Sequence, residues 1–294
     1  MRTVRIFQVD AFTDTPFAGN PAGVVLDAQL LSEAEMQAIA RELNNGDTAF
    51  VLPPADDTED LHVRFFTPRK EAPFVGHATL AVHAVLDADV SAPLRRQGGR
   101  TGIVQVHADA GRFSIRQPAP PLGRTLGECE LQDVLGLLDL KREQLDRACP
   151  PRIAGSASTR LLLGLRDTTA LDAVQPALAA LATLSPRIGA QGFFLFVRNE
   201  GGTGTESRMF CPALGIDEDP VSGNAHAMLG VYLRELGLLP ARQGGAQFTG
   251  RQGRHVGRPG QVDVEMELGG DGRATAVSIA GRAVIVFESE ITLA

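Results

Sequence analysis

Two stretches of the chain, Arg64–Pro68 (RFFTP) and Arg208–Pro212 (RMFCP), share the pattern Arg-x-Phe-x-Pro. After an acid-containing loop, each is followed by an apolar run that begins with Gly, a polar residue and Ala: Gly76–Leu86 (GHATLAVHAVL) and Gly223–Leu233 (GNAHAMLGVYL). Each copy predicts a strand, a loop and a helix too apolar to lie on a surface. We therefore expect two related halves, with both helix starts pointing towards a cleft between them.

The composition is that of a globular protein with a substantial core. The chain has 294 residues, of which 44% are hydrophobic and 21% charged, enough for two domains of about 100–150 residues. A net charge of −7 without a basic cluster argues against nucleic-acid binding. No signal peptide or membrane-spanning apolar run is seen, and three scattered cysteines fit a reducing compartment. A cytoplasmic protein without a membrane partner is expected.

The pattern of the first half predicts mainly strands. A capping box at Ser32 and Glu35 predicts a helix over 33–43. Strands are predicted at 4–10, 23–26, 48–52, 62–66, 102–107 and 112–116. The stretch 117–121 (QPAPP) breaks every regular pattern. It sets a boundary between a first domain, 1–117, and a second, 118–294, with a strand near 283–294 that could return to the first.

The second half mixes helices and strands. Helices are predicted at 130–138, 141–147 and 170–183, and strands at 192–198, 261–268, 274–279 and 283–287. Strands rarely alternate one-for-one with helices, which favours an α+β fold over a doubly wound parallel sheet. A single apolar helix in each half would be best buried by a sheet that curls around it.

Local motifs for cofactor or metal chemistry are missing from the sequence. Gly201–Gly204 (GGTG) lacks the Lys-Ser/Thr of a phosphate-binding loop and the third Gly of a dinucleotide fingerprint, so a turn is expected there. The six histidines form no His-x-x-x-His pair, and His77 and His83 would point to different sides of their helix. We expect no metal site.

The two helix starts are candidate binding sites. Free backbone N–H groups at Gly76 and Gly223 would favour a carboxylate or a developing enolate, although each Gly could instead serve tight packing. Acidic residues occur nearby, at Glu71, Asp47 and Asp217–Asp219. Moving a proton between carbons needs an acid and a base whose pKa values are tuned by burial. Asp219, beside Pro220 in an apolar context, stands out among the acids. His77 at the helix start could be a histidine satisfied by the helix cap or a ligand to the substrate.

Several of these blocks resemble one family. Gly19–Pro21 (GNP), Phe66-x-Pro68, Gly76–Thr79 (GHAT) and Glu218–Asn224 (EDPVSGN) are similar to the signature blocks of the phenazine-biosynthesis PhzF-like family, which shares the diaminopimelate epimerase fold. The resemblance implies two pseudo-symmetric domains, each a barrel-like, mostly antiparallel sheet around a central helix. It also implies cofactor-free isomerase chemistry, commonly in homodimers. In the founding enzyme a Glu shifts a proton on a dihydro-hydroxyanthranilate.

The chain departs from the family pattern at three places. The family's catalytic Glu falls within Asn44–Phe50 (NNGDTAF), where this chain has Asp47, whose carboxylate reaches about 1.5 Å less far. The epimerase branch has catalytic cysteines where this chain has Val75 and Ser222, so two-thiol racemisation is excluded. Asn224 replaces a Ser, and both side chains can bind a carboxylate.

We therefore expect a cofactor- and metal-independent isomerase that shifts a proton on a small carboxylated metabolite, cyclic or unsaturated, in a biosynthetic process. The residues expected to be catalytic are Asp47, Asp219 and His77. Those expected to bind the substrate are Asn20, Gly76, Gly223 and Asn224. A metabolite-binding or regulatory protein that has lost catalysis is the main alternative, and a lyase or hydrolase on the same scaffold is another.

Overall fold

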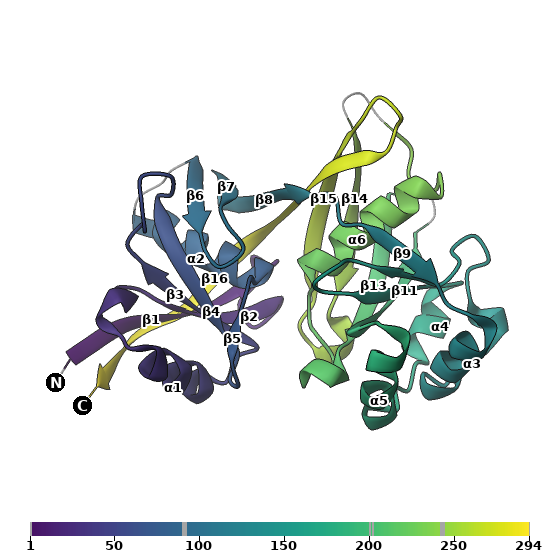
Figure 1. The fold of residues 1–294 in the computed structure, drawn as a ribbon, viewed down its shortest axis with the longest axis horizontal. Coiled ribbons are helices and arrows are strands. Elements are labelled where there is room, and N and C mark those ends of the chain that lie inside the picture. The colour runs from purple at the N-terminus through teal and green to yellow at the C-terminus, as the bar shows by residue number, and fades with distance from the viewer. Residues whose placement is uncertain (1, 90–92, 200, 202, 242–244, 294) are drawn as a thin grey trace. The chain divides into compact units, whose positions relative to one another are not determined.

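The computed structural model describes residues 2–89, 93–199, 201, 203–241 and 245–293 (Figure 1). It divides into two compact units, one made of Met1–Arg116 with Ala280–Ala294 and the other of Gln117–Ile279. Each unit combines a mixed, mostly antiparallel sheet with a few helices, so the predicted α+β class is confirmed.

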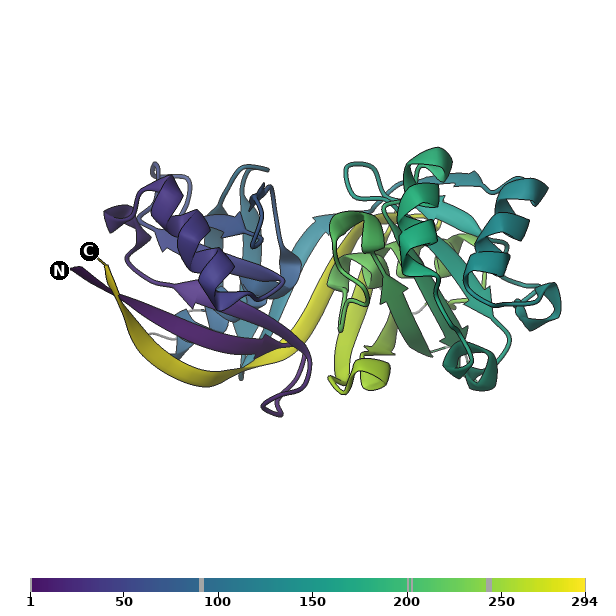
Figure 2. The ribbon, with the colours of Figure 1, turned by 90° about the horizontal axis from the view of Figure 1, so that it is seen from below.

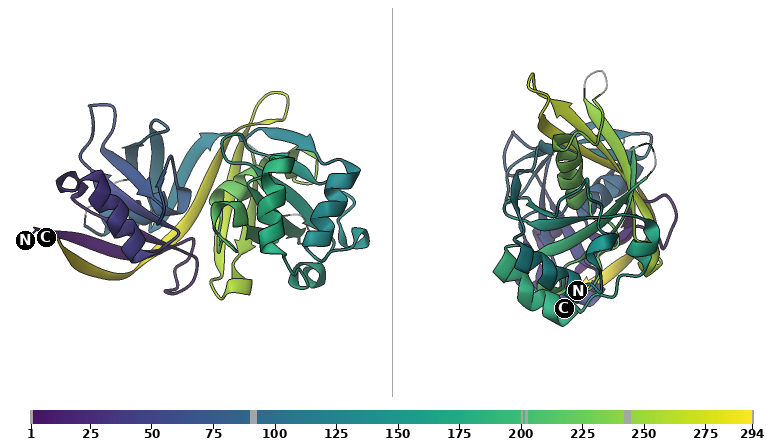
Figure 3. Two further views of the ribbon diagram at one scale, coloured as in Figure 1. Left: turned by 60° about the horizontal axis from the view of Figure 1, so that its bottom comes forward. Right: turned by 90° about the vertical axis from the view of Figure 1, so that its right-hand side faces the viewer.

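In the first unit the sheet closes into a barrel. The strand order is β1-β2-β3-β4-β6-β7-β8-β16, and β16 pairs with β1 to complete a ring of eight within the described residues. The strands are β1 (Arg2–Ala11), β2 (Asn20–Val25), β3 (Asp47–Leu52), β4 (Leu61–Phe66), β6 (Leu94–Gly98), β7 (Val104–Asp109), β8 (Arg112–Pro118) and β16 (Ala274–Leu293). A short β5 (Glu71–Ala72) pairs with β4. Figures 2 and 3 show the two chain ends side by side, where Arg2 pairs with Leu293.

The predicted apolar helix of the first half is α2 (Gly76–Asp89), and it forms the core of this barrel. It packs against β1, β2, β3 and β7. Its fully buried apolar side chains are those of Ala78, Leu80, Ala81, Val82 and Val85. The outer helix α1 (Glu33–Leu43) has the predicted bounds, because Ser32 and Glu35 form the predicted capping box at its start.

The second unit is a sheet with helices on both faces. Its strands follow the order β16-β15-β14-β13-β12-β11-β10-β9. They are β9 (Leu122–Thr125), β10 (Arg152–Ala154), β11 (Arg160–Leu165), β12 (Gly192–Arg198), β13 (Gly204–Phe210), β14 (Ala246–Gln252), β15 (Gly260–Leu268) and the beginning of β16. The helices are α3 (Glu128–Leu137), α4 (Thr168–Asp172), α5 (Leu178–Ile188) and α6 (Gly223–Glu235).

Strand β12 shows how the two faces are filled. Phe193 and Leu195 join the apolar core that includes α3 and α5, which Figures 1 and 3 show together on one side of the sheet. Phe194 faces the other way and contacts His226 on α6, with ring centroids 5.1 Å apart. Side chains alternate along a strand, so one fully apolar strand serves both cores.

The topology displays the duplication that the sequence predicts. In the first unit, two parallel strand pairs enclose helices: β2 and β3 flank α1, and β4 and β6 flank α2. In the second unit, β11 and β12 flank α4 and α5, and β13 and β14 flank α6. Parallel neighbours need a crossover, usually a helix. The two units therefore use the same order of crossovers, and the Arg-x-Phe-x-Pro strands β4 and β13 occupy matching places.

Four predicted elements differ from the structure. The strands expected at 274–279 and 283–287 are one strand, β16, because Gly281 is not a turn: a Cβ there would lie 2.5 Å from Phe12 Cδ1. The helix expected at 141–147 is only a 3₁₀ turn, Arg142–Gln144, because the next residues run along β11, with the Asp146 N–H bonded to Gly164 O. The helix expected at 170–183 is split into α4 and α5 around Pro176.

Several strands were not predicted, namely β5, β6, β9, β10, β11 and β14. All six residues of β11 are buried, so it lacks the alternation that marks a half-exposed strand. Of the expected turn Gly201–Gly204, Gly202 lies outside the described residues and Gly204 already begins β13. None of the helices in the described ranges is both long enough and apolar enough to span a membrane.

Candidate active site

Asp47 and His77 lie together in the first unit. Strand β3 begins at Asp47, which pairs with Ala22 of β2, and α2 begins one residue before His77. His77 Nε2 lies 3.7 Å from Asp47 Oδ2, and each side chain is 13% exposed. The barrel thus brings together two of the three residues that the sequence predicts as catalytic.

The imidazole of His77 has a spare polar atom. Its Nε2 is buried and has no hydrogen-bond partner among the described residues, since 3.7 Å to Asp47 exceeds hydrogen-bond length. Burial lowers the pKa of His77 to about 4, so the ring is neutral at neutral pH. A neutral imidazole has one donor and one acceptor nitrogen. A buried polar atom left unbonded is uncommon, and catalytic use is one of its recognised explanations.

A buried hydrogen-bond chain supports the start of α2. Val75 O accepts from the Thr79 N–H at 3.0 Å and from the Thr79 hydroxyl at 2.9 Å. Gln97, from β6, donates to that hydroxyl at 3.3 Å, and its Oε1 lies 3.0 Å from His83 Nε2. The side chains of Thr79, His83 and Gln97 are at most 1% exposed. His83 is therefore a satisfied core residue, and it helps to hold the helix that carries His77.

Gly76 is not explained by close packing. A Cβ built on Gly76 would meet no heavy atom of the described residues within 4 Å, so a side chain would fit there. Of the two interpretations of this glycine, the structure favours binding of an anion by the exposed backbone N–H groups over tight packing. An anion at a helix N-terminus is stabilised by the free N–H groups and by the helix dipole.

The start of α6 is held more tightly. Ser222 caps this helix, its hydroxyl accepting from the Ala225 N–H at 3.3 Å. The Asp219 N–H donates to Met209 O of β13 at 2.8 Å. Gly223 is buried and Asn224 is half-buried. Asp219, Gly223 and Asn224 thus share one short segment of the second unit, while Asn20 begins β2 in the first unit and is 5% exposed.

The repeated arginines have a role that sequence reasoning missed. Arg64 binds Glu71 at 2.8 Å and lies over the Phe66 ring, 5.2 Å from its centroid. Arg208 binds Glu218 at 2.8 Å and lies over the Phe210 ring at 4.9 Å. Arg and Phe two residues apart on a strand share a face, and this spacing was the available signal.

Glu71 is therefore committed to an ion pair. The hydrogen bond from Arg64 lowers the pKa of the Glu71 carboxyl, with help from the charges of Arg64 and Arg100. Glu71 stays ionised and bonded, which suits a structural anchor better than a proton shuttle. Of the acidic residues near the helix starts, Asp47 and Asp219 remain the candidates.

The buried thiols are unsuited to catalysis as thiolates. Cys149 and Cys211 are both 1% exposed, and burial raises the pKa of each to about 12. They behave as small apolar side chains. Among the described residues no cluster of three or more His, Cys, Asp or Glu is placed to hold a metal ion.

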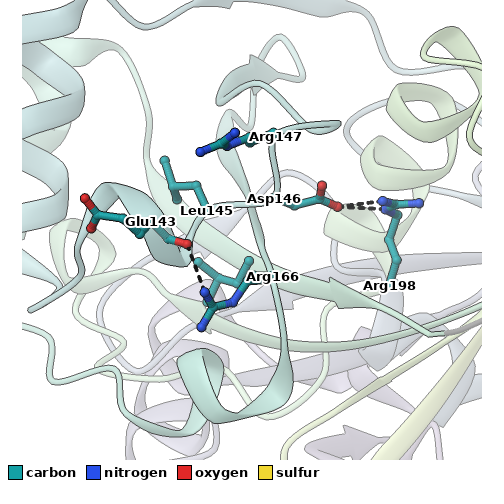
Figure 4. A pocket seen from close by; sticks show the side chains of 7 residues that line it. Glu143, Leu145, Asp146, Arg147, Arg166 and Arg198 are labelled. Carbon is teal, nitrogen blue, oxygen red and sulfur yellow. Dashed lines mark hydrogen bonds and ion pairs between the residues drawn. The ribbon is translucent and has the colours of Figure 1, made fainter.

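The second unit contains an open cavity away from the predicted residues. Its volume is about 450 Å³. Its lining consists of Glu143, Leu145, Asp146, Arg147, Leu165, Arg166 and Arg198. Figure 4 shows Asp146 facing Arg198, a pair bonded at 2.7 Å, and Arg166 bonded to the backbone of Glu143. None of the residues predicted from the sequence lines this cavity.

Comparison with known proteins settles the family. The model of the phenazine biosynthesis-like protein family, PhzC-PhzF, matches residues 9–289. This chain belongs to that family. An uncharacterised isomerase, YddE, from Salmonella typhimurium is 38% identical over 97% of both chains. The trans-2,3-dihydro-3-hydroxyanthranilate isomerase of Pseudomonas aeruginosa is 31% identical over 98% of this chain and 99% of its own. The predicted family is confirmed.

Solved structures agree on the fold. A PhzF-family protein of Bacillus anthracis superposes with a TM-score of 0.86 at 25% identity, covering 100% of both chains. A hydroxyproline epimerase of Agrobacterium vitis is 12% identical, covers 99% of this chain and 93% of its own, and has a TM-score of 0.67. At this low identity, the similarity to the hydroxyproline epimerase shows a shared fold and nothing more. The predicted epimerase-like architecture is confirmed.

Proposed function

We propose that this PhzF-family protein is an isomerase that moves a proton within a small carboxylated metabolite, cyclic or unsaturated, with Asp47 as the acid/base. The observation that carries the proposal is the pair formed by Asp47 and His77, in which a buried, unbonded Nε2 lies 3.7 Å from a carboxylate oxygen. The names of the relatives support the reaction class, since they include isomerases that match nearly the whole chain.

The reaction leaves the composition of the substrate unchanged. The Asp47 carboxylate removes a proton from one carbon, and the electron pair delocalises towards an acceptor group. The resulting carboxylic acid exchanges its proton with water and then returns a proton to another carbon. Neutral His77 can donate to or accept from the substrate without adding a charge. The reaction requires neither a metal nor an organic cofactor in this proposal.

Each unit offers backbone and amide groups that would bind a carboxylate. In the first unit these are the N–H groups at Gly76, where the dipole of α2 favours an anion, and the side-chain amide of Asn20. In the second unit they are the N–H groups at Gly223 and the side-chain amide of Asn224, and Asp219 would orient a ligand through a polar hydrogen or a cationic group. The family resemblance implies a homodimer, and we propose the same assembly for this chain. Light scattering on the purified protein would test it.

Isotope exchange tests the function directly. The wild type is incubated in deuterium oxide with a panel of cyclic and unsaturated carboxylic acids, and deuterium at carbon is measured by mass spectrometry. We expect incorporation for at least one compound and a loss of about a hundredfold or more in Asp47→Asn. Asp57→Asn, which alters an exposed acid of the same unit, should match the wild type. Turnover with full retention of the substrate hydrogen would contradict an exchanging base at Asp47.

A binding protein without catalysis is the second candidate. It is favoured by Asp47 itself, whose carboxylate is one C–C bond shorter than the Glu of the family pattern. Calorimetric binding of a carboxylate by the wild type, with no exchange in any compound of the panel, would support this alternative. Loss of that binding in Asn224→Leu would place the bound carboxylate at the start of α6.

A further inference from the structure

We propose that Gln252 is a positioning residue that fixes the segment Asp219–Gly223, an inference that rests on the proposed role of that segment in substrate binding. Gln252 ends strand β14, and its side chain is 2% exposed. Its Oε1 accepts from the Ser222 N–H at 3.2 Å, and its Nε2 donates to Asp219 O at 2.6 Å. One side chain therefore holds both ends of the turn that leads into α6.

These two bonds admit only one orientation of the amide. Turning it over would place the NH₂ group against the Ser222 N–H and the oxygen against Asp219 O, which are two repulsive contacts. The bond to the Ser222 N–H is buried and the bond to Asp219 O is partly buried, so loss of either partner would leave a backbone group at least partly shielded from water and unpaired. The side chain thus sets the separation between the carbonyl of Asp219 and the N–H that precedes Gly223.

The next residue reinforces the same contact. Gly253 has a φ of 93°, in the left-handed region, and a Cβ there would lie 2.7 Å from Pro220 O and 2.2 Å from Arg258 O. The backbone of Gly253 therefore packs closely against the segment Asp219–Gly223 at Pro220. This close approach explains why glycine follows Gln252.

The rest of the segment is anchored on other strands and on α6. The Asp219 N–H is bound to Met209 O at 2.8 Å, and His226 Nδ1 lies 2.7 Å from Ser222 O. The side chain of Gln252 connects this anchored segment to β14. Without it, the Asp219 carboxylate and the first N–H groups of α6 would shift relative to each other. A displacement of about 1 Å in such groups can cost about a hundredfold in rate.

The test replaces Gln252 by residues of similar size. Gln252→Met removes both bonds, and Gln247→Met, at an exposed position of the same strand, is the matched control. We expect Gln252→Met to lower kcat/KM about ten- to a hundredfold and to speed amide hydrogen exchange at Ser222 and Ala225. The control should leave both unchanged.

A charged variant separates positioning from general damage to the fold. In Gln252→Glu the carboxylate still accepts from Ser222 but donates to Asp219 O only when protonated. Its activity relative to wild type should therefore rise as the pH falls, whereas Gln252→Met should show a constant ratio. If Gln252→Met does not fold, Gln252→Asn, which is shorter and can keep one bond, takes its place.

The outcomes distinguish this inference from the proposed function. Wild-type kcat/KM together with wild-type exchange in Gln252→Met would overturn the positioning role. A wild type that turns over no compound would end the isomerase proposal. Faster amide hydrogen exchange at Ser222 in Gln252→Met would, in that case, still support the positioning role of Gln252. If the activity of Gln252→Glu relative to wild type does not change with pH, the positioning role of Gln252 is also contradicted.

Discussion

Arg208 donates two hydrogen bonds to the carboxylate of Glu218, one from Nε at 2.9 Å and one from a terminal nitrogen at 2.8 Å. Glu218 directly precedes Asp219, so this pair fixes the beginning of the segment that leads into α6. Arg208 also donates to the backbone oxygens of Leu171 and Val174. The guanidinium of Arg208 therefore connects three parts of the second unit: strand β13, the loop that contains Glu218 and Asp219, and the end of α4 with the turn that follows it.

Arg208→Lys should destabilise the protein by about 1–3 kcal/mol, because an ammonium cannot make the bidentate contact or reach the backbone oxygens at the same time. The measurement is urea unfolding followed by circular dichroism. Arg166→Lys is the control, since the Arg166–Asp167 pair has side chains 61% and 41% exposed, and it should cost about 0.5 kcal/mol or less. Equal effects in the two variants would contradict the anchoring role.

Asp47→Glu should lower the rate of isotope exchange in an active wild type. The added CH₂ moves the carboxylate about 1.5 Å, and His77 Nε2 lies only 3.7 Å from the present position of Oδ2. We expect a loss of about tenfold or more. If the wild type shows no exchange and Asp47→Glu does, catalysis was lost when aspartate replaced the glutamate of the family pattern, and the binding protein is favoured.

The free energy of unfolding should fall as the pH is lowered from 7 to 5. Burial lowers the pKa values of His77, His83 and His226 to about 4 each, against about 6.5 when unfolded. Between these values the unfolded chain binds more protons, so stability present above pH 6.5 is lost towards pH 4. The full loss is on the order of 3 kcal/mol per histidine.

His226→Gln should make this pH dependence shallower by removing one contributor. His107→Gln, at an exposed position, serves as the control and should keep the wild-type slope. The comparison is between slopes of unfolding free energy against pH, so an overall destabilisation of either variant does not affect it. An unchanged slope in His226→Gln would contradict the buried neutral state of this ring.

Gly250→Ala should be strongly destabilising. The added Cβ would lie 2.0 Å from His226 Cδ2, and that ring is fully buried and held by Ser222 O. We expect a cost of about 1–3 kcal/mol in thermal unfolding. Gly136→Ala, on an exposed face of α3 with no atom within 4 Å of the new Cβ, should stabilise by about 0.5–1 kcal/mol. Recovery in a combined variant with His226→Ala would confirm the clash.

The sequence predicts the core of the fold well because local signals agree with it. The capping box at Ser32 bounds α1, and the apolar runs identify α2 and α6. Strand β11 was missed because both of its faces are buried, which removes the alternation. The break predicted near Gly281 was wrong because close contact with Phe12, and not a turn, requires the glycine. Tertiary contacts of this kind leave no periodic signal.

The candidate site was predicted in part. The family blocks name Asp47 and His77, which the structure places within 3.7 Å. Gln97 and Gln252 were not found, although each belongs to an Arg-Gln-Gly triplet, Arg96–Gly98 and Arg251–Gly253, at the end of the strand after a core helix. Only the pairing of β6 with β4 and of β14 with β13 reveals that these triplets lie near the helix starts.

The pairing of β1 with β16 has a consequence for biosynthesis. The barrel of the first unit needs Ala280–Ala294, so residues 1–116 cannot complete it until the whole of the second unit has been synthesised. Gln117–Ile279, by contrast, is continuous and can fold as soon as it emerges. The first unit thus completes its structure only after the segment that makes up the second unit has been synthesised.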